Sequence, residues 1–198
     1  MAQPRQKIAI VGHSLVWWLN HFIQNDANTL PNLGITNADV RCILTPVKKG
    51  LIIDDLLLIK DDLIQFRPDI MVLILGDNDL YKTAPEDLSL RLLAAGTLLR
   101  GWTGAAKLIH FELFPRFWTS SAHYFTPTYN QDALLVNERL REGVRDLHQT
   151  FVWACHGPSF HDSRASKYFL WDGVHLNNEG QVLLCRAVQK AIHMFRNF

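Results

Sequence analysis

The sequence contains little cysteine, and its few cysteines lack the spacing of a metal site. Three occur in 198 residues, Cys42, Cys155 and Cys185, with no C-x-x-C pair among them. An odd number without paired spacing indicates neither a disulfide framework nor a thiolate zinc site. Apolar residues flank each cysteine, which favours buried, unreactive thiols in a reducing, intracellular compartment.

An excess of charge of one sign is also missing. Twenty Lys and Arg against nineteen Asp and Glu give a formal net charge of +1. A protein that grips a phosphate backbone carries a strongly basic face instead. We therefore expect no direct contact with nucleic acid.

Long hydrophobic runs are absent too. The longest, such as Ile70–Leu75, fall far short of the ~18 residues that a membrane-spanning helix needs. The start of the chain is polar and leads into a short apolar run without a cleavage-like site, which is not typical of a signal peptide. We expect no membrane span and a cytoplasmic location.

What the sequence does contain is the material for one packed domain over residues 1–198. The residues are 48% hydrophobic and 20% charged, as is usual for globular proteins. Short β-rich runs alternate about five times with stretches of helical periodicity. This predicts a three-layer α/β/α fold, in which helices cover both faces of a parallel sheet of about five strands. We expect strands at 7–11, 39–44, 70–75, 106–113 and 150–154, and helices at 15–25, 52–66, 85–100, 130–148 and 178–195.

The residues that follow the predicted strands carry most of the chemistry. Ligands of doubly wound sheets bind at the carboxyl ends of the strands, so these positions are the first candidates for a site. Together they supply a nucleophile, a base, an acid and amide donors. The four segments are Gly12-His13-Ser14-Leu15, Gly50, Gly76-Asp77-Asn78-Asp79 and Asp172-Gly173-Val174-His175.

Ser14 and His175 have complementary chemistry. A serine hydroxyl becomes a nucleophile when a neighbouring base takes its proton, and Asp172 is close enough in sequence to hold one tautomer of the His175 imidazole. Asn78 and Gly50 could donate hydrogen bonds to an oxyanion. Each residue by itself also has an ordinary explanation, because serine caps helices and Asn and Gly form turns.

As a set, the four segments resemble the sequence blocks of the SGNH hydrolases, also called GDSL-type esterases and lipases. Ser14, Gly50, Asn78 and His175 match the residues of the family's name in order, over nearly the whole chain. The match of Gly50 rests on its position alone. The resemblance implies a flavodoxin-like topology, a catalytic triad of Ser14, His175 and Asp172, and an oxyanion hole formed by Ser14, Gly50 and Asn78. It implies no cofactor.

One residue departs from the family's pattern. His13 stands where the usual G-D-S-L motif has aspartate, which affects substrate preference and loop geometry more than the chemistry. Three segments also resemble the catalytic subunits of platelet-activating-factor acetylhydrolases: Phe114-Pro115-Arg116, Val136–Leu140 and Asp172–Gly180. Similar modules occur in retrotransposon-encoded proteins, which is a looser similarity.

Other catalytic motifs fit less well. An α/β-hydrolase elbow requires G-x-S-x-G, but Val16 stands where the second glycine should be. The dinucleotide fingerprint, the P-loop and the H-E-x-x-H zinc motif are absent from the sequence. We therefore expect neither a cofactor nor a metal.

Aromatic residues are numerous around the predicted site. Core packing explains most of them, and we expect only a minority to touch a ligand. The best candidates for a substrate pocket are Trp171 and one of Trp17 and Trp18, together with His13.

Two hypotheses from different classes follow. The first is a serine esterase that hydrolyses the acyl or acetyl ester of a small molecule or lipid through an acyl-enzyme. The second is a binding or assembly module of a larger, retrotransposon-derived protein that keeps the fold with little or no activity. The natural substrate and the oligomeric state stay open under both, and an acyl acceptor other than water would make the first a transferase. Hydrolysis of a p-nitrophenyl ester separates the two hypotheses.

Overall fold

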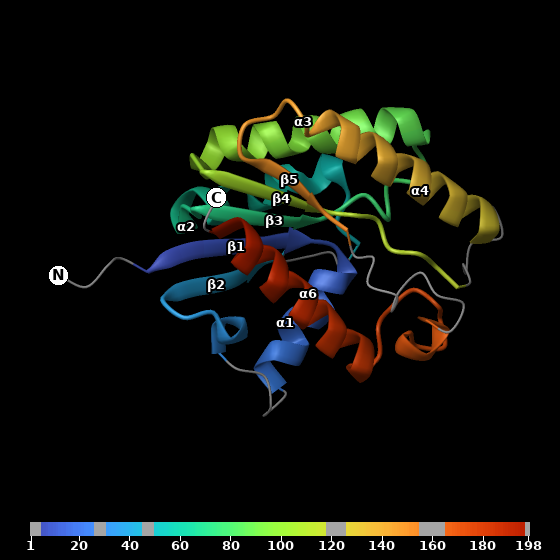
Figure 1. The fold of residues 1–198 in the computed structure, drawn as a ribbon, viewed down its shortest axis with the longest axis horizontal. Coiled ribbons are helices and arrows are strands. Elements are labelled where there is room, and N and C mark those ends of the chain that lie inside the picture. Colours follow the sequence, from blue (N-terminus) through green and yellow to red (C-terminus); the bar gives the residue numbers. More distant parts are fainter. Residues whose placement is uncertain (1–4, 26–30, 45–49, 118–125, 155–164, 197–198) are drawn as a thin grey trace.

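A five-stranded parallel sheet forms the middle of the computed structural model (Figure 1), which describes residues 5–25, 31–44, 50–117, 126–154 and 165–196. Its strands are β1 (Gln6–Gly12), β2 (Ala38–Ile43), β3 (Ile70–Ile74), β4 (Lys107–Phe111) and β5 (Thr150–Trp153). Neighbouring strands are parallel throughout, in the order β2-β1-β3-β4-β5. This order confirms the predicted α/β class. The winding direction switches between β1 and β3, which is where doubly wound proteins bind ligands.

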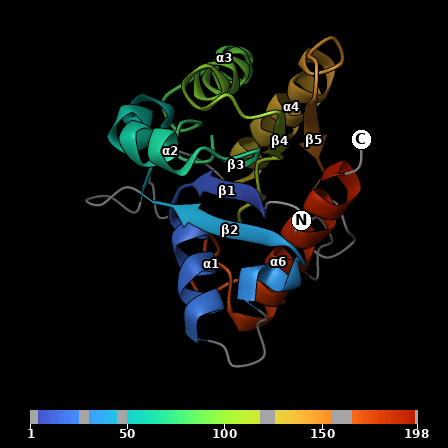
Figure 2. The same cartoon turned by 90° about the vertical axis from the view of Figure 1, so that its left-hand side faces the viewer.

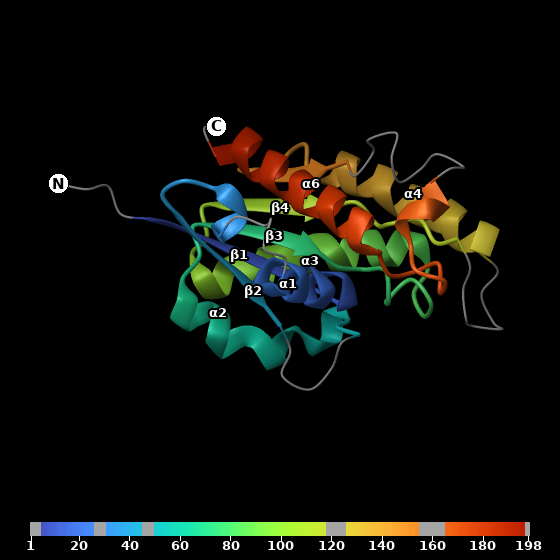
Figure 3. The same cartoon turned by 90° about the horizontal axis from the view of Figure 1, so that it is seen from below.

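Helices cover both faces of the sheet, as Figures 2 and 3 show. One face carries α1 (Ser14–Asn25) and α6 (Asn178–Arg196). The opposite face carries α2 (Lys60–Phe66), α3 (Pro85–Thr103) and α4 (Thr126–Gly143). Within the described residues, no helix combines the length and hydropathy needed to cross a bilayer.

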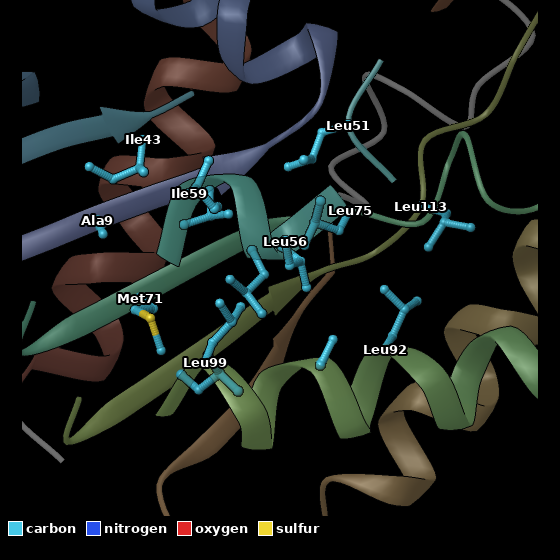
Figure 4. Packing of buried hydrophobic residues seen from close by; sticks show 14 of the residues in the cluster. Ala9, Ile43, Leu51, Leu56, Ile59, Met71, Leu75, Leu92, Leu99 and Leu113 are labelled. Carbon is cyan, nitrogen blue, oxygen red and sulfur yellow. The ribbon is translucent and has the colours of Figure 1, made fainter. Parts of the chain in front are cut away.

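Strand residues alternate between the two helical layers. In β1, Ile8 and Ile10 pack toward α1 and α6, whereas Ala9 and Val11 pack on the opposite face. All five residues of β3 are buried, as the continuous apolar run predicts. Figure 4 shows the apolar layer between the sheet and α3. Each fully buried aliphatic side chain there contributes ~1.5–3 kcal/mol through removal from water.

The helix expected from residue 52 is in fact two elements. Residues Ile53–Ile59 form a 3-10 helix, and α2 follows directly. Leu56 and Ile59 are three positions apart and both are buried, which is the spacing that a helix of three residues per turn places on one side. The apolar pattern therefore fits both geometries, and the prediction of a single α-helix was wrong.

The helix expected at 130–148 lies nearer the N-terminus, at Thr126–Gly143. Pro127 is tolerated in its first turn because N–H groups there have no partner within a helix. The helix ends at Gly143, where glycine is a poor helix former. Gly143 also packs closely on α3, since an added Cβ would lie 2.4 Å from Leu93 Cδ1.

The cysteines that the structure describes are half-buried. Cys42 lies on β2 and Cys185 on α6. Burial, and after it the proximity of Cys185, raises the pKa of the Cys42 thiol to about 12. Its reactive thiolate form is therefore scarce at neutral pH. Cys155 lies outside the described residues.

β4 carries a buried histidine beneath α3. His110 is 2% exposed, and its Nε2 has no hydrogen-bond partner within the described part of the chain. A Cβ added to Gly96 of α3 would lie 2.8 Å from that nitrogen, so the ring is closely packed. Burial, and after it the Arg100 cation, lowers the pKa of His110 to about 4.

We expect this histidine to make the fold sensitive to mild acid. The unfolded chain protonates the ring near pH 6.5 and the folded chain near pH 4, so the unfolded state binds more protons in between. The free energy of unfolding is therefore complete above pH 6.5 and falls by ~3 kcal/mol as the pH decreases to 4. Urea unfolding midpoints of the wild type and of His110→Leu across this range measure the effect. His193→Leu, at an exposed position of α6, is the control, and a wild-type slope in His110→Leu would contradict the expectation.

Candidate active site

β1 ends in a turn that only glycine permits. A Cβ on Gly12 would lie 2.4 Å from the carbonyl oxygen of Ile74 in β3 and 2.4 Å from Val16 Cγ2 in α1. The missing side chain lets β1 run close beside β3 and turn at once into α1. Ser14 is the first residue of that helix, at the carboxyl edge of the sheet.

Three side chains at this edge form a continuous chain of hydrogen bonds. Ser14 Oγ lies 2.9 Å from His175 Nε2, although 161 positions separate the two residues. His175 Nδ1 lies 2.7 Å from Asp172 Oδ2. If Nδ1 donates to the carboxylate, Nε2 is free to accept the serine proton. The imidazole and the carboxylate are 27% and 28% exposed, so a ligand can reach them.

The loop that carries Asp172 and His175 is built by local hydrogen bonds. The backbone N–H groups of Val174 and His175 both donate to Asp172 Oδ1, at 2.9 Å each. A bridge between Phe169 and Leu176 closes the loop. Burial alone would raise the pKa of the Asp172 carboxyl, but these backbone bonds and the imidazole together hold it below its usual value. The carboxylate therefore stays ionised and can orient His175 at neutral pH.

Asn78 and Gly50 lie beside each other after β3 and β2. A Cβ on Gly50 would lie 3.8 Å from Asn78 Nδ2, and Nδ2 donates to the Leu51 carbonyl at 3.3 Å. Asp79 accepts a hydrogen bond from the Ile53 N–H at 3.0 Å, which ties the same two segments together. Since Gly12 of β1 pairs with Ile74 of β3, Ser14 and Asn78 follow neighbouring strand ends at one edge of the sheet.

A buried, hydrogen-bonded pair of side chains, which the sequence pattern did not predict, lies beneath this edge. His13 Nε2 lies 2.8 Å from Asp77 Oδ2, and both side chains are almost fully buried. The N–H of Leu15 faces His13 Nδ1 at 3.4 Å, which assigns the proton to Nε2 as the donor to Asp77. Burial would raise the pKa of Asp77, but the attraction of His13 and Arg116 keeps it below its usual value.

Asp77 is also the acceptor for the loop that follows β4. Its Oδ1 accepts hydrogen bonds from the Phe114 N–H at 3.0 Å and from the Tyr129 hydroxyl at 3.2 Å. Arg116 donates to the Asp77 carbonyl at 3.1 Å and stacks over Tyr129, with its guanidinium carbon 4.6 Å from the ring centroid. One carboxylate thus joins the ends of β1, β3 and β4 under the site. The feature of the sequence that could have indicated these contacts is the aspartate Asp77 itself, which lies between Gly76 and Asn78.

The aromatic candidates are placed differently from one another. Trp18 lies one helical turn after Ser14, and its ring centroid is 6.3 Å from that of His175. Trp17 instead stacks on His21 at 5.7 Å. Trp171 is 87% exposed, so little of it is covered by protein. His13 is only 3% exposed, and its burial does not support a role in contacting substrate.

No group of His, Cys, Asp and Glu side chains in the described ranges has the arrangement of a metal site.

The chain matches the family model of GDSL-like lipases and acylhydrolases over residues 19–188. The matched region begins after Ser14 and contains Gly50, Asn78, Asp172 and His175. A search of curated protein sequences gave no significant match.

Solved structures share the fold at low identity. A GDSL-like lipase from Bacteroides thetaiotaomicron has a TM-score of 0.72 and 17% identity, covering 98% of this chain and 92% of its own. A lipase from a goat rumen metagenome has a TM-score of 0.66 and 14% identity, and the match covers 94% of this chain and 97% of the lipase. A catalytic mutant of an acetylxylan esterase from Geobacillus stearothermophilus has a TM-score of 0.60 and 14% identity, and the match covers 96% of this chain and 95% of the esterase. At this low identity, the solved structures show a shared fold alone. The family model, in contrast, matches most of the chain. The chain therefore belongs to the GDSL-like lipase/acylhydrolase family.

Proposed function

We propose that the chain is a serine esterase that hydrolyses carboxylic esters of small molecules or lipids through an acyl-enzyme. The observation that carries the proposal is the hydrogen-bonded chain from Ser14 Oγ through His175 to Asp172, with distances of 2.9 and 2.7 Å. Membership of an acylhydrolase family supports ester hydrolysis in general.

The reaction proceeds in two steps. Ser14 Oγ attacks the ester carbonyl carbon while His175 Nε2 takes its proton. His175 then gives this proton to the leaving alcohol oxygen as the carbon–oxygen bond breaks, which leaves an acyl group on Ser14. A water molecule, deprotonated by the same nitrogen, then attacks the acyl carbon. The bond between that carbon and Ser14 Oγ breaks, His175 returns the proton to Ser14 Oγ, and the carboxylic acid leaves. Asp172 holds the imidazole in the required tautomer throughout.

Three donors would stabilise the oxyanion of each tetrahedral intermediate. They are the backbone N–H groups of Ser14 and Gly50 and the side-chain amide of Asn78. The proposal is supported by the start of α1 at Ser14 and by the proximity of Gly50 to Asn78 Nδ2. The Asn78 amide has two hydrogens, and the 3.3 Å bond to Leu51 uses one of them. One such donor commonly contributes ~10²–10³ to kcat.

A fluorescent organophosphonate is expected to label the wild-type chain but not Ser14→Ala, because only a base-activated hydroxyl reacts readily. Fluorescence on a denaturing gel and hydrolysis of p-nitrophenyl acetate are measured on the same preparations. Ser89→Ala removes a buried serine of α3 that bonds the Glu86 carbonyl, and this control keeps both signals. Labelling that persists in Ser14→Ala removes Ser14 from the mechanism. A wild type that neither reacts nor hydrolyses the ester favours the binding-module hypothesis.

A further inference from the structure

The residue before Ser14 is hydrogen-bonded to the residue before Asn78. His13 Nε2 donates to Asp77 Oδ2 at 2.8 Å, and the two side chains are 2% and 4% exposed. The proposed oxyanion hole takes one donor from each of the residues that follow, the backbone N–H of Ser14 and the side-chain amide of Asn78. A single buried hydrogen bond therefore connects the two segments that carry these donors.

This side-chain bond lies just beyond the point where the backbones of β1 and β3 separate. The His13 N–H still donates to the Ile74 carbonyl, at 3.4 Å. The first segment then enters α1 at Ser14, whereas Asn78 lies in the turn that follows β3. The bond between His13 and Asp77 connects the two segments again after they have diverged.

Asp77 is also held from other directions. Its Oδ1 accepts hydrogen bonds from the Phe114 N–H at 3.0 Å and from the Tyr129 hydroxyl at 3.2 Å. Arg116 donates to its backbone carbonyl at 3.1 Å. These contacts use Oδ1 and the backbone, whereas His13 uses Oδ2. The carboxylate is therefore a fixed anchor, to which His13 connects the start of α1.

His13 in turn holds the first turn of α1. Its carbonyl accepts hydrogen bonds from the N–H groups of Val16 and Trp17, at 3.0 and 3.2 Å. The Leu15 N–H donates to its Nδ1 at 3.4 Å, in the manner of a side chain that caps a helix N-terminus. None of these three bonds uses the Ser14 N–H, which is the donor assigned to the oxyanion. A displacement of His13 would therefore displace this turn, and Ser14 with it.

We propose that His13 and Asp77 are positioning residues, which set the distance between the oxyanion donors of Ser14 and Asn78. The inference rests on the proposed esterase function. Both side chains are too deeply buried to touch a substrate, so they act through the two residues that follow them. An oxyanion donor is effective at about 2.7–3.1 Å from the developing charge, and a displacement of ~1 Å can lower a rate ~10²-fold.

Asparagine and glutamine at position 13 separate the two contacts of the imidazole. Asparagine can place an acceptor near the position of Nδ1 but is too short to donate to Asp77, whereas glutamine can place its NH₂ group near the position of Nε2. We expect His13→Asn to lower kcat for p-nitrophenyl acetate about tenfold to hundredfold, with KM changed less than about threefold. His13→Gln should recover kcat to within about threefold of the wild type.

Tyr129→Phe is the matched control. It removes another hydrogen bond to the same carboxylate, the one to Oδ1, and leaves the bond between His13 and Asp77 in place. The urea unfolding midpoint should fall, because a buried hydrogen bond is lost, while kcat remains within about twofold of the wild type. If kcat instead falls in proportion to the loss of stability in all three variants, the pair has only a structural role and the proposal is wrong.

A double variant tests whether the pair acts through Asn78. Asn78→Ala removes one oxyanion donor and is expected to lower kcat ~10²–10³-fold. Because this background has no Asn78 donor to align, the addition of His13→Asn should lower kcat by no more than about threefold further. If His13→Asn has its full effect in this background, the pair does not align the two donors.

A measurement on the wild type tests the same contacts without a substitution at position 13, and it applies even if such a variant fails to fold. The contacts require a proton on His13 Nε2 and none on Nδ1. Nitrogen NMR chemical shifts of the imidazole distinguish the two tautomers and the cation. We expect the tautomer with the proton on Nε2 at neutral pH, and a proton on Nδ1 would contradict the proposal.

The outcomes separate this inference from the proposed function. If the wild type hydrolyses p-nitrophenyl acetate and His13→Asn has the same kcat, the pair has no positioning role and the esterase proposal survives. If His13→Gln is as slow as His13→Asn, the bond to Asp77 is not the contact that matters, and the inference is again wrong. If the wild type hydrolyses no ester, both proposals are wrong.

Discussion

Replacing His175 with alanine is expected to lower kcat for p-nitrophenyl acetate by about 10⁴-fold or more. The proposed base is 2.9 Å from Ser14 Oγ, and without it the hydroxyl keeps its proton and remains a poor nucleophile. Circular dichroism and the urea unfolding midpoint check that the variant is folded. His193→Ala is the matched control. His193 lies at an exposed position of α6, the helix that follows His175 in the chain, and the variant should retain full activity.

Asp172→Asn is expected to lose no more activity than His175→Ala, and about 10²–10⁴-fold in kcat. The side-chain oxygen of asparagine can still accept the two hydrogen bonds that the backbone N–H groups of Val174 and His175 donate to Asp172 Oδ1, at 2.9 Å each. Its side-chain NH₂ group, however, would face His175 Nδ1 and favour the tautomer that cannot take the serine proton. Activity that survives in His175→Ala would assign the base to another residue and would remove Asp172 from the mechanism with it.

Replacing His13 with aspartate, the residue of the usual G-D-S-L motif at this position, is expected to destabilise this chain. The His13 and Asp77 side chains are 2% and 4% exposed and lie 2.8 Å apart. In His13→Asp, two buried carboxylates would face each other without a compensating cation in that contact. We expect the free energy of unfolding at pH 7, measured in urea, to fall by ~3 kcal/mol or more.

The double variant His13→Asp/Asp77→Asn tests whether the two positions act as a pair. An asparagine amide can donate to the carboxylate that His13→Asp introduces, so the double variant should be more stable than His13→Asp alone. Asp39→Asn changes a partly exposed carboxylate that pairs with Arg41 on the surface, and this control should shift the free energy of unfolding by less than ~1 kcal/mol. If the loss of unfolding free energy in the double variant equals the sum of the losses in His13→Asp and in Asp77→Asn, positions 13 and 77 are independent.

Sequence reasoning succeeded where a local pattern has one structural explanation. The continuous apolar run at Ile70 predicted a strand buried on both faces, and β3 is fully buried. Pro68 predicted the end of the preceding helix, and Arg67 before it leaves the helical region with φ 53° and ψ 66°. It failed where one pattern fits two geometries, as in the 3-10 helix Ile53–Ile59. Apolar residues three apart suit that helix as well as the expected α-helix.

The contacts of side chains across the sheet could not be predicted from the sequence. Successive residues of a helix point about 100° apart, so whether Trp17 or Trp18 faces the site depends on how α1 is rotated against the sheet. Trp171 directly precedes Asp172 in the same loop, yet it is 87% exposed, because tertiary packing sets the direction of a loop. Pairing of His13 with Asp77 depends on the neighbouring positions of β1 and β3, which only the strand order reveals.

The distance along the chain between Ser14 and His175 has a consequence for the order of folding. Their hydrogen bond joins residues 161 positions apart, through helices α1 and α6 that pack on the same face (Figure 3). Contacts between such remote segments close the largest loops and are slow to form. The layer around α3 and β4 can assemble earlier from nearer segments. A partly folded chain would therefore carry an inert serine, and during refolding the reactivity of Ser14 should return only when α6 docks beside α1.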